Sequence, residues 1–304
     1  MLRFCLLASA GSAGAFMVAP LASRATSVAK FGPLMQEGEV IDDSPIEAPP
    51  GWEAVPEDLW GDDKKADIRI EGGKTLKTFA MPADAERVQY IIKSPNGRPV
   101  KAKAELWIGP IRCVHEMIYN CMDGGDFPLK ATLQFKKLSP VLKISTDGSF
   151  EFPLVCGVFV PSKEESAKIG ETCWDMWDNA AMKERVQGGS TIDGKGGAIR
   201  TFPIDPAWEK TQIMVSSRDV GKKSFKTNIE VLQGPNNAKQ HINLRCGGST
   251  QPYHAIIDTP GPGWMLRCNS KKFLEDGLFE IAVSQYGESG TMGADDGVVV
   301  GGQW

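Results

Sequence analysis

The sequence predicts a mainly β protein: two tandem homologous β-sandwich-like domains with a connecting helix, related by a pseudo-twofold axis. Three observations predict this fold, namely an internal duplication, apolar residues that alternate with period two in each copy, and helical periodicity between the copies. The chain has 304 residues, which suits about two domains of the usual size. Apolar residues make up 41% and charged residues 24%, as in a globular protein that buries a core in each copy.

The duplication is visible as five matched segments in the same order. They are 76–79 with 199–202, 86–89 with 209–212, 101–110 with 226–235, Cys121 with Cys246, and 148–151 with 277–280. These matches place domain copy 1 at residues 72–161 and domain copy 2 at residues 196–287.

The first 36 residues predict a bipartite plastid targeting sequence. Arg3 precedes a short apolar run and then small residues, which is the layout of a cleavable signal, and the first carboxylate of the chain is Glu37. The stretch 8–16 resembles the plastid signals of diatoms and related algae, in which a Phe, here Phe16, follows the cleavage point. An ordinary secretory signal is the alternative. Removal of residues 1–36 takes three positive charges from a chain of net charge −4 and leaves −7.

Residues 37–71 predict an acidic, proline-rich arm. Its composition cannot bury enough apolar surface to offset the entropy lost on ordering, so we expect an extended or disordered segment. Trp52 and Trp60 are its isolated aromatic residues. We expect them to dock either on the arm's own domain or on a neighbouring molecule.

Each copy is predicted to consist of short β-strands. In copy 1 the even-numbered apolar positions from Val100 to Ile108 alternate with polar ones, and in copy 2 the positions from Phe225 to Val231 keep the same parity. The Pro-Asn-Gly turn at 95–97 follows the apolar run 88–92, which predicts a hairpin between that run and 100–108.

Residues 162–195 predict a helical linker. Ser162 and Glu165 form a capping-box pattern, and Gly188 is the expected stop. Trp174 and Trp177 lie on the apolar face, which we expect to pack across the two β-domains rather than hold a cofactor.

Residues 288–304 form a Gly-rich tail with a terminal β-segment. A short β-branched run that ends in Trp is suited to pairing with an exposed sheet edge, its own or a neighbour's. The predicted assembly interface therefore consists of Val298, Val299, Val300, Trp304, Trp52 and Trp60.

The sequence predicts no catalytic, cofactor-binding or metal-binding residues. The three histidines, His115, His241 and His254, lack a zinc-type spacing, and the chain contains no nucleophile elbow, P-loop or dinucleotide fingerprint. A metal site built from His115, Cys113 and Cys121 is the alternative. Without clustered basic and aromatic residues, nucleic acid is not an expected partner.

Two further patterns concern single residue types. Glu105 and Glu230 alternate with lysines on the outward side of matched strands, which favours a solvated or interface face over an acid/base pair. Apart from Cys5, the six cysteines do not duplicate in pairs, so buried free thiols are expected rather than disulfides.

Residues 72–287, with the duplicated Thr-Phe, Glu-x-x-Gln and Gly-Pro elements and the presequence, resemble the diatom pyrenoid shell proteins (PyShell family). The resemblance implies a non-catalytic structural protein, without cofactors, that self-assembles into a sheet around the Rubisco-containing pyrenoid and supports CO2 concentration and fixation. It implies copies of itself, paralogous shell proteins and Rubisco as partners, no transmembrane segment, and a place in the plastid stroma at the pyrenoid periphery.

Two other functions remain open at this point. One is a plastid enzyme such as a metal-dependent carbonic anhydrase. The other is a sugar-binding β-sandwich that stacks glycans on Trp107, Trp208 and Trp264.

Overall fold

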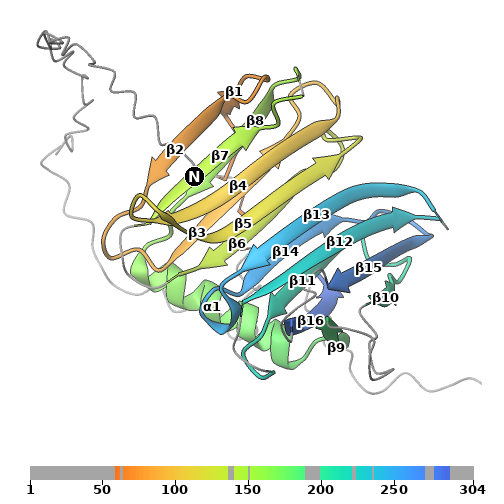
Figure 1. The fold of residues 1–304 in the computed structure, drawn as a ribbon. Coiled ribbons are helices and arrows are strands. Elements are labelled where there is room, and N and C mark those ends of the chain that lie inside the picture. Colours follow the sequence, from red (N-terminus) through yellow and green to blue (C-terminus); the bar gives the residue numbers. More distant parts are fainter. Residues whose placement is uncertain are drawn as a thin grey trace, which may run out of the picture. The chain divides into compact units, whose positions relative to one another are not determined.

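The structure is a computed structural model, and it describes residues 59–61, 64–135, 140–149, 151–188, 199–220, 224–234, 236–270 and 277–287. These residues belong to one compact unit, Ala54–Trp304. They form two eight-stranded antiparallel sheets and the helix α1 (Figure 1). The prediction of a mainly β protein is confirmed.

Sheet A contains strands from both halves of the chain. Its order is β1 (Ile68–Ile70), β8 (Leu154–Phe159), β3 (Arg87–Lys93), β6 (Leu129–Gln134), β14 (Tyr253–Asp258), β11 (Lys210–Ser216), β16 (Gly277–Gln285) and β9 (Met182–Gly188). The edge strands are therefore β1 and β9.

Sheet B is assembled in the same way. Its order is β10 (Ile199–Pro203), β15 (Trp264–Ser270), β12 (Phe225–Gln233), β13 (Ala238–Cys246), β5 (Arg112–Cys121), β4 (Val100–Ile108), β7 (Val141–Thr146) and β2 (Leu76–Ala80). A 3-10 turn, Gly248–Thr250, follows β13.

Each sheet has the same strand order when it is followed inward from either edge, once the strands of the two halves are matched. Each strand from β1 to β8 is matched to the strand whose number is higher by eight, for example β3 to β11. The two halves meet at β6–β14, where Ala131 pairs with Ala255, and at β5–β13, where Ile118 pairs with Asn243. Both junctions are continuous antiparallel pairs, so the sheets run through from one half to the other.

The inward side chains of both sheets form one apolar cluster. In β4, Val100, Ala102, Ala104 and Leu106 belong to it, and in β12 the matched residues Phe225, Ile229 and Val231 do. The predicted burial parity of these two strands is confirmed. The cluster extends over both halves, so the expectation of a separate core in each copy is wrong: the halves join edge to edge and share one core.

Helix α1 (Lys163–Asp178) begins as the sequence predicts. The Ser162 Oγ atom accepts a hydrogen bond from the Glu165 backbone N–H at 3.2 Å, and the Glu165 carboxylate accepts one from the Ser162 N–H at 2.8 Å. The predicted stop at Gly188 is wrong, because the helix ends at Asp178 and the chain continues into β9. The linker predicted as helical therefore contains a sheet-edge strand.

Two other predictions about local structure differ from the structure. The runs predicted as a hairpin form β3 and β4, but β3 lies in sheet A and β4 in sheet B, so the turn between them carries the chain from one sheet to the other. Residues 68–70, predicted to lie in the extended or disordered arm, form β1 and pair with β8.

Candidate functional site

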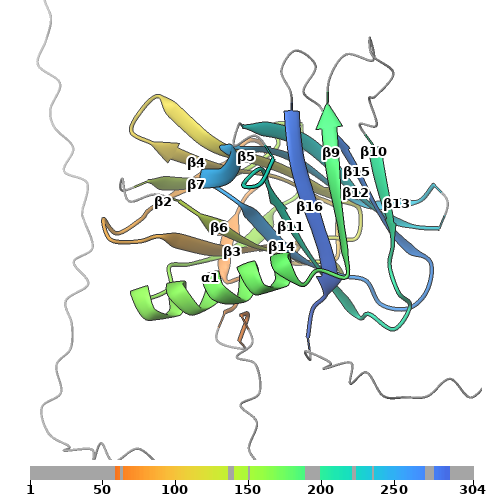
Figure 2. The same ribbon diagram turned by 90° about the horizontal axis from the view of Figure 1, so that it is seen from below.

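Helix α1 covers the outer face of sheet A. Ile169, Cys173, Met176 and Trp177 of the helix form a second apolar cluster with sheet residues of both halves, namely Ile91, Met214, Ile256 and Ala282. Figure 2 shows the helix crossing the strands of this sheet. The expectation that the helix packs its tryptophan face across both halves is confirmed for Trp177, which is completely buried.

Of the predicted assembly residues, the structure describes Trp60 alone. Trp60 is 4% exposed and lies with Leu59 in the cluster beneath α1. Its ring therefore docks on its own domain, which was one of two expectations, and has no exposed face for a neighbouring molecule. Trp52, Val298, Val299, Val300 and Trp304 lie outside the described residues.

The outer face of sheet B carries alternating charged side chains and, among the described residues, is not covered by a helix. On β4, Glu105 is only 4% exposed, yet its carboxylate lies 2.8 Å from the Nζ atoms of both Lys103 and Lys143. Burial opposes the charge of Glu105, but the two ammonium groups outweigh it and hold the pKa below its usual value. Glu105 is thus a structural anion.

The second half repeats this arrangement at the matched position. Glu230 on β12 lies opposite Arg267 on β15, as Glu105 lies opposite Lys143, and Arg267 Nε donates to its carboxylate at 2.6 Å. Asn228 donates to the same carboxylate at 2.8 Å, in the place that Lys103 has in the first half. The two matched carboxylates lie on the outward side of their strands as expected, and both form ion pairs with cations of their own sheet. The expectation of a solvated face is wrong for Glu105, because two lysines cover it and leave it 4% exposed.

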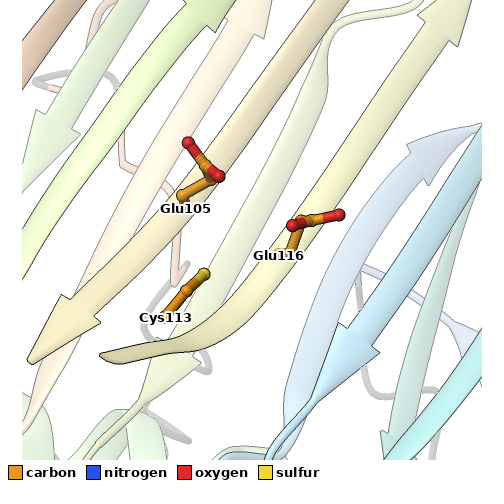
Figure 3. A group of neighbouring side chains, drawn as sticks. All are labelled: Glu105, Cys113 and Glu116. Carbon is orange, nitrogen blue, oxygen red and sulfur yellow. The ribbon is translucent and has the colours of Figure 1, made fainter. Parts of the chain in front are cut away.

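Three potential metal ligands gather on this face. Glu105, Cys113 and Glu116 bring one ligand atom each within 4.8 Å of the others (Figure 3). Glu116 lies 3.4 Å from Lys103, so both carboxylates already pair with lysine. Burial, followed by the charges of the two glutamates, raises the pKa of the Cys113 thiol and keeps it protonated. A metal ion at this place would have to displace the lysine ammonium groups from both carboxylates and the proton from the thiol.

The alternative metal site is not assembled either. His115 faces the core, where its Nδ1 atom lies 3.1 Å from the Cys246 Sγ atom, whereas Cys113 is on the outer face. Cys121 follows His115 by six residues on the same strand, a separation of about 20 Å. These three residues therefore cannot share one ion.

The His115–Cys246 pair could not be found from the sequence, because 131 residues separate its members. Complete burial lowers the pKa of His115 to about 3 and raises the pKa of the Cys246 thiol well above its usual value. Both groups are neutral at physiological pH. The pair lacks the thiolate that nucleophilic catalysis requires.

The tryptophans considered for sugar stacking differ in burial. Trp264 is 3% exposed and its indole N–H donates to the Pro260 carbonyl at 2.8 Å, while Trp208 and Trp107 are half-buried. Trp264 therefore offers no stacking surface, and the structure does not expose the full ring of any of the three. The six cysteines from Cys113 to Cys268 are free thiols, and all except Cys113 are buried.

The edge strands of sheet B expose matched apolar residues. Leu76 at the start of β2 is 48% exposed, and Ile199 at the start of β10 is 53% exposed. Within the described ranges each of these strands pairs with one neighbour, β7 or β15, so one row of backbone hydrogen-bonding groups faces outward. Thr78 pairs with Lys143 and Thr201 with Arg267, so the two edge strands have equivalent ladder partners. They differ in their surroundings, because Arg200 of β10 lies 3.5 Å from Glu184 of β9.

Comparison with protein families decides the assignment. The sequence profile of the family described as diatom pyrenoid shell protein matches residues 60–285, which are most of the chain and almost all of its described residues. The chain belongs to the diatom pyrenoid shell protein family. This membership indicates a structural role in the pyrenoid and a location in the plastid.

The other comparisons add little to the family assignment. No curated protein matches the sequence. A solved structure from work on the substrate binding mode and reaction specificity of oxalate decarboxylase is 10% identical, with 73% of this chain and 78% of that chain covered and a TM-score of 0.15. A likeness of that size carries no argument about fold or function. Within the described ranges of this pyrenoid shell protein, no helix has both the length and the apolar character needed to cross a membrane.

Proposed function

We propose that this chain is a non-catalytic structural protein that self-assembles into a sheet-like shell enclosing the Rubisco-containing pyrenoid. Such a shell keeps CO2 near Rubisco and supports its fixation. The observation that carries the proposal is the family match over residues 60–285. The polar groups of the described part fit the proposal, since the carboxylates Glu105 and Glu230 are paired and the His115–Cys246 pair is neutral and buried.

The strand order supports self-assembly. We propose that the halves are duplicated units related by a pseudo-twofold axis, because each sheet reads identically from both ends and matched residues have matched partners. One molecule then presents similar surfaces in two directions. Repeated contacts of this kind that do not close into a ring generate extended assemblies.

The two edges of sheet B are the matched surfaces that we propose for lattice contacts. Leu76 and Ile199 are exposed there next to backbone groups that pair with no described strand, and a β-strand can bind at such an edge. The tail segment Val298–Val300, with Trp304, has the β-branched composition of a strand that could add to an edge. We propose that it latches neighbouring molecules. In the cell, residues 1–36 would direct the chain to the plastid stroma and be removed.

Imaging and sedimentation of the purified chain from residue 37 to residue 304 test this function. We expect large sheets or tubes that pellet at moderate speed, and weaker assembly after deletion of residues 288–304. A second variant keeps the tail length but exchanges Val298, Val299 and Val300 for serine, which removes β-propensity without shortening the chain. We expect this variant to weaken assembly as the deletion does. A monodisperse monomer at high protein concentration would overturn the proposal.

A further inference from the structure

Three cationic side chains lie together at one corner of sheet B. Lys226 on β12 pairs directly with Arg245 on β13, and both point away from the core. Arg112, at the start of β5, lines the same pocket of about 210 Å³ as Arg245. We call Arg112, Lys226 and Arg245 the basic corner; all three are exposed.

The charges of the basic corner are not neutralised by the described part of the chain. None of the three has a described carboxylate within 4.0 Å, and Arg245 makes a weak polar contact with the Cys113 carbonyl at 3.4 Å. Glu116 lies across the β13–β5 pair from Arg245, but its carboxylate turns to Lys103. Like charges directly opposite each other on a sheet destabilise it. Such a corner is stabilised when carboxylates bind to it.

Among the residues that the structure describes, the corner occurs once. The ladder pair that corresponds to Lys226 and Arg245 in the first half is Lys101 and Asn120, so one cation is replaced by a neutral amide. Elsewhere on this face, Lys143 and Arg267 have their own glutamates. The basic corner is thus an asymmetric feature on an otherwise matched face.

The chain itself contains the complementary charge. Residues 37–58, the acidic segment, hold eight carboxylates (Glu37, Glu39, Asp42, Asp43, Glu47, Glu53, Glu57 and Asp58) and no lysine or arginine. Fully extended, a segment of this length spans up to about 70 Å. It is followed directly by Leu59, which with Trp60 is buried beneath α1 on the outer face of sheet A. The segment therefore starts from one face of the described unit, while the basic corner lies on the opposite face.

We propose that the acidic segment of one molecule binds the basic corner of a second copy of this chain. A contact between opposite faces of successive molecules is head-to-tail and leaves a free segment and a free corner at the two ends. Charge complementarity would also set the direction and speed of association. This inference rests on the proposed self-assembly and names one of its contacts.

Charge reversal in two separate chains provides the test. We expect K226E/R245E to raise the protein concentration needed for assembly about tenfold, which corresponds to about 1.4 kcal/mol, and E53K/E57K/D58K to do the same. Mixing the two variants restores assembly, because the acidic segment of K226E/R245E can bind the unaltered basic corner of E53K/E57K/D58K, and the reversed segment can bind the reversed corner. K65E/K163E is the matched control: it reverses two exposed lysines away from sheet B and leaves assembly unchanged.

Carbodiimide cross-linking tests the contact in the unaltered chain. The reagent activates a carboxylate, which forms an amide with a lysine amine while the carbodiimide becomes a urea. In an assembled mixture of ¹⁴N and ¹⁵N chains, we expect Lys226 joined to the acidic segment in mixed-isotope peptides. Same-isotope peptides alone would show a segment that folds back on its own chain and would overturn the inference.

The outcomes separate this inference from the proposed function. If K226E/R245E assembles as well as the wild-type chain, the acidic-segment contact is contradicted and shell formation is not. The same holds if the mixture of the two variants assembles no better than either variant alone. Cross-links from Lys226 to another protein in place of the acidic segment also overturn it. Wild-type chains that never assemble overturn both.

Discussion

The Nδ1 atom of His115 lies 3.1 Å from the Sγ atom of Cys246, and this buried contact joins the two halves of the protein inside sheet B. Its counterpart across the junction is the ladder pair of Cys121 and Gln240. Each half thus places a cysteine against a polar residue of the other half. These polar pairs lie in an apolar core, where their members meet each other in only one register of β5 against β13. They therefore favour that register over a shifted one.

Acid should destabilise the fold through its buried histidines. Burial lowers the pKa of His115 to about 3 and that of His254 to about 4, compared with about 6.5 in an unfolded chain. Between these values the unfolded chain binds protons that the folded chain does not, so stability falls as the pH drops below about 6.5. We expect each histidine to remove about 2 kcal/mol from the free energy of unfolding between pH 7 and pH 5, measured by urea denaturation.

Substitutions identify the source of this pH dependence. H115Q places a glutamine where the second half has Gln240 and should flatten the dependence by the contribution of one histidine. H254Q, at the other buried histidine, should flatten the dependence by a similar amount. An unchanged slope in H115Q would contradict the explanation.

Glu105 should stabilise the sheet more than its neighbour Glu116 does. Glu105 is buried between two lysines at 2.8 Å, whereas Glu116 is more exposed and makes one 3.4 Å contact. We expect E105Q to lower the free energy of unfolding by about 2 kcal/mol and E116Q by less than about 1 kcal/mol.

The pH range of the Glu105 effect follows from its lowered pKa. Since the folded pKa is below the unfolded one, the stabilisation is present above the unfolded pKa of about 4.5 and is lost as the pH falls through the folded value. E105Q and wild type should therefore differ at pH 7 and converge under strongly acid conditions. Equal losses from E105Q and E116Q at pH 7 would show that burial between lysines adds nothing.

The two helix tryptophans should differ in their contribution to stability. Trp177 is completely buried between α1 and sheet A and donates a hydrogen bond to Asp219 at 3.2 Å, whereas Trp174 is half-buried beneath the Arg218 guanidinium. We expect W177A to lower the free energy of unfolding by about 3–5 kcal/mol and W174A by about 1 kcal/mol. Thermal unfolding followed by circular dichroism would measure both, and a smaller loss for W177A than for W174A would contradict the packing of Trp177 between α1 and sheet A.

Local signals predicted much of the fold. Ser162 and Glu165 placed the helix start because a capping box depends on four consecutive residues. Alternation in β4 and β12 gave the buried face because strand side chains project with period two. The matched segments 76–79 and 199–202 form edge strands with equivalent partners, as the duplication predicts.

Features set by distant partners could not be predicted. The segment of β9, Met-Lys-Glu-Arg-Val-Gln-Gly, has the composition of a helix, and it becomes a strand because β16 offers it a sheet edge. The hairpin prediction failed because a turn sequence does not reveal whether the next strand pairs with the last one or crosses to the facing sheet. The predicted match of 148–151 with 277–280 is also out of register. Tyr90 of β3 pairs with Val158, and the equivalent residue of β11, Ile213, pairs with Val283, so Val158 and Val283 occupy corresponding positions.

Gly170 should be required in α1 by the guanidinium of Arg87. An added Cβ atom at Gly170 would lie 2.3 Å from the Arg87 Nη2 atom, and this guanidinium is buried, with Nη1 bonded to the Ser166 hydroxyl at 3.0 Å. Alanine normally stabilises a helix interior by about 1 kcal/mol relative to glycine. Here we expect G170A to lower the free energy of unfolding by about 1–3 kcal/mol, because the guanidinium must move from a packed site.

A double-mutant cycle isolates the cause. R87M removes the guanidinium and leaves an unbranched apolar side chain, so G170A added to R87M should no longer destabilise and should recover its helix propensity. The coupling energy between the two substitutions is therefore expected to be favourable and about 1–3 kcal/mol. If G170A destabilises R87M as much as wild type, the glycine is needed for a reason other than the approach of Arg87.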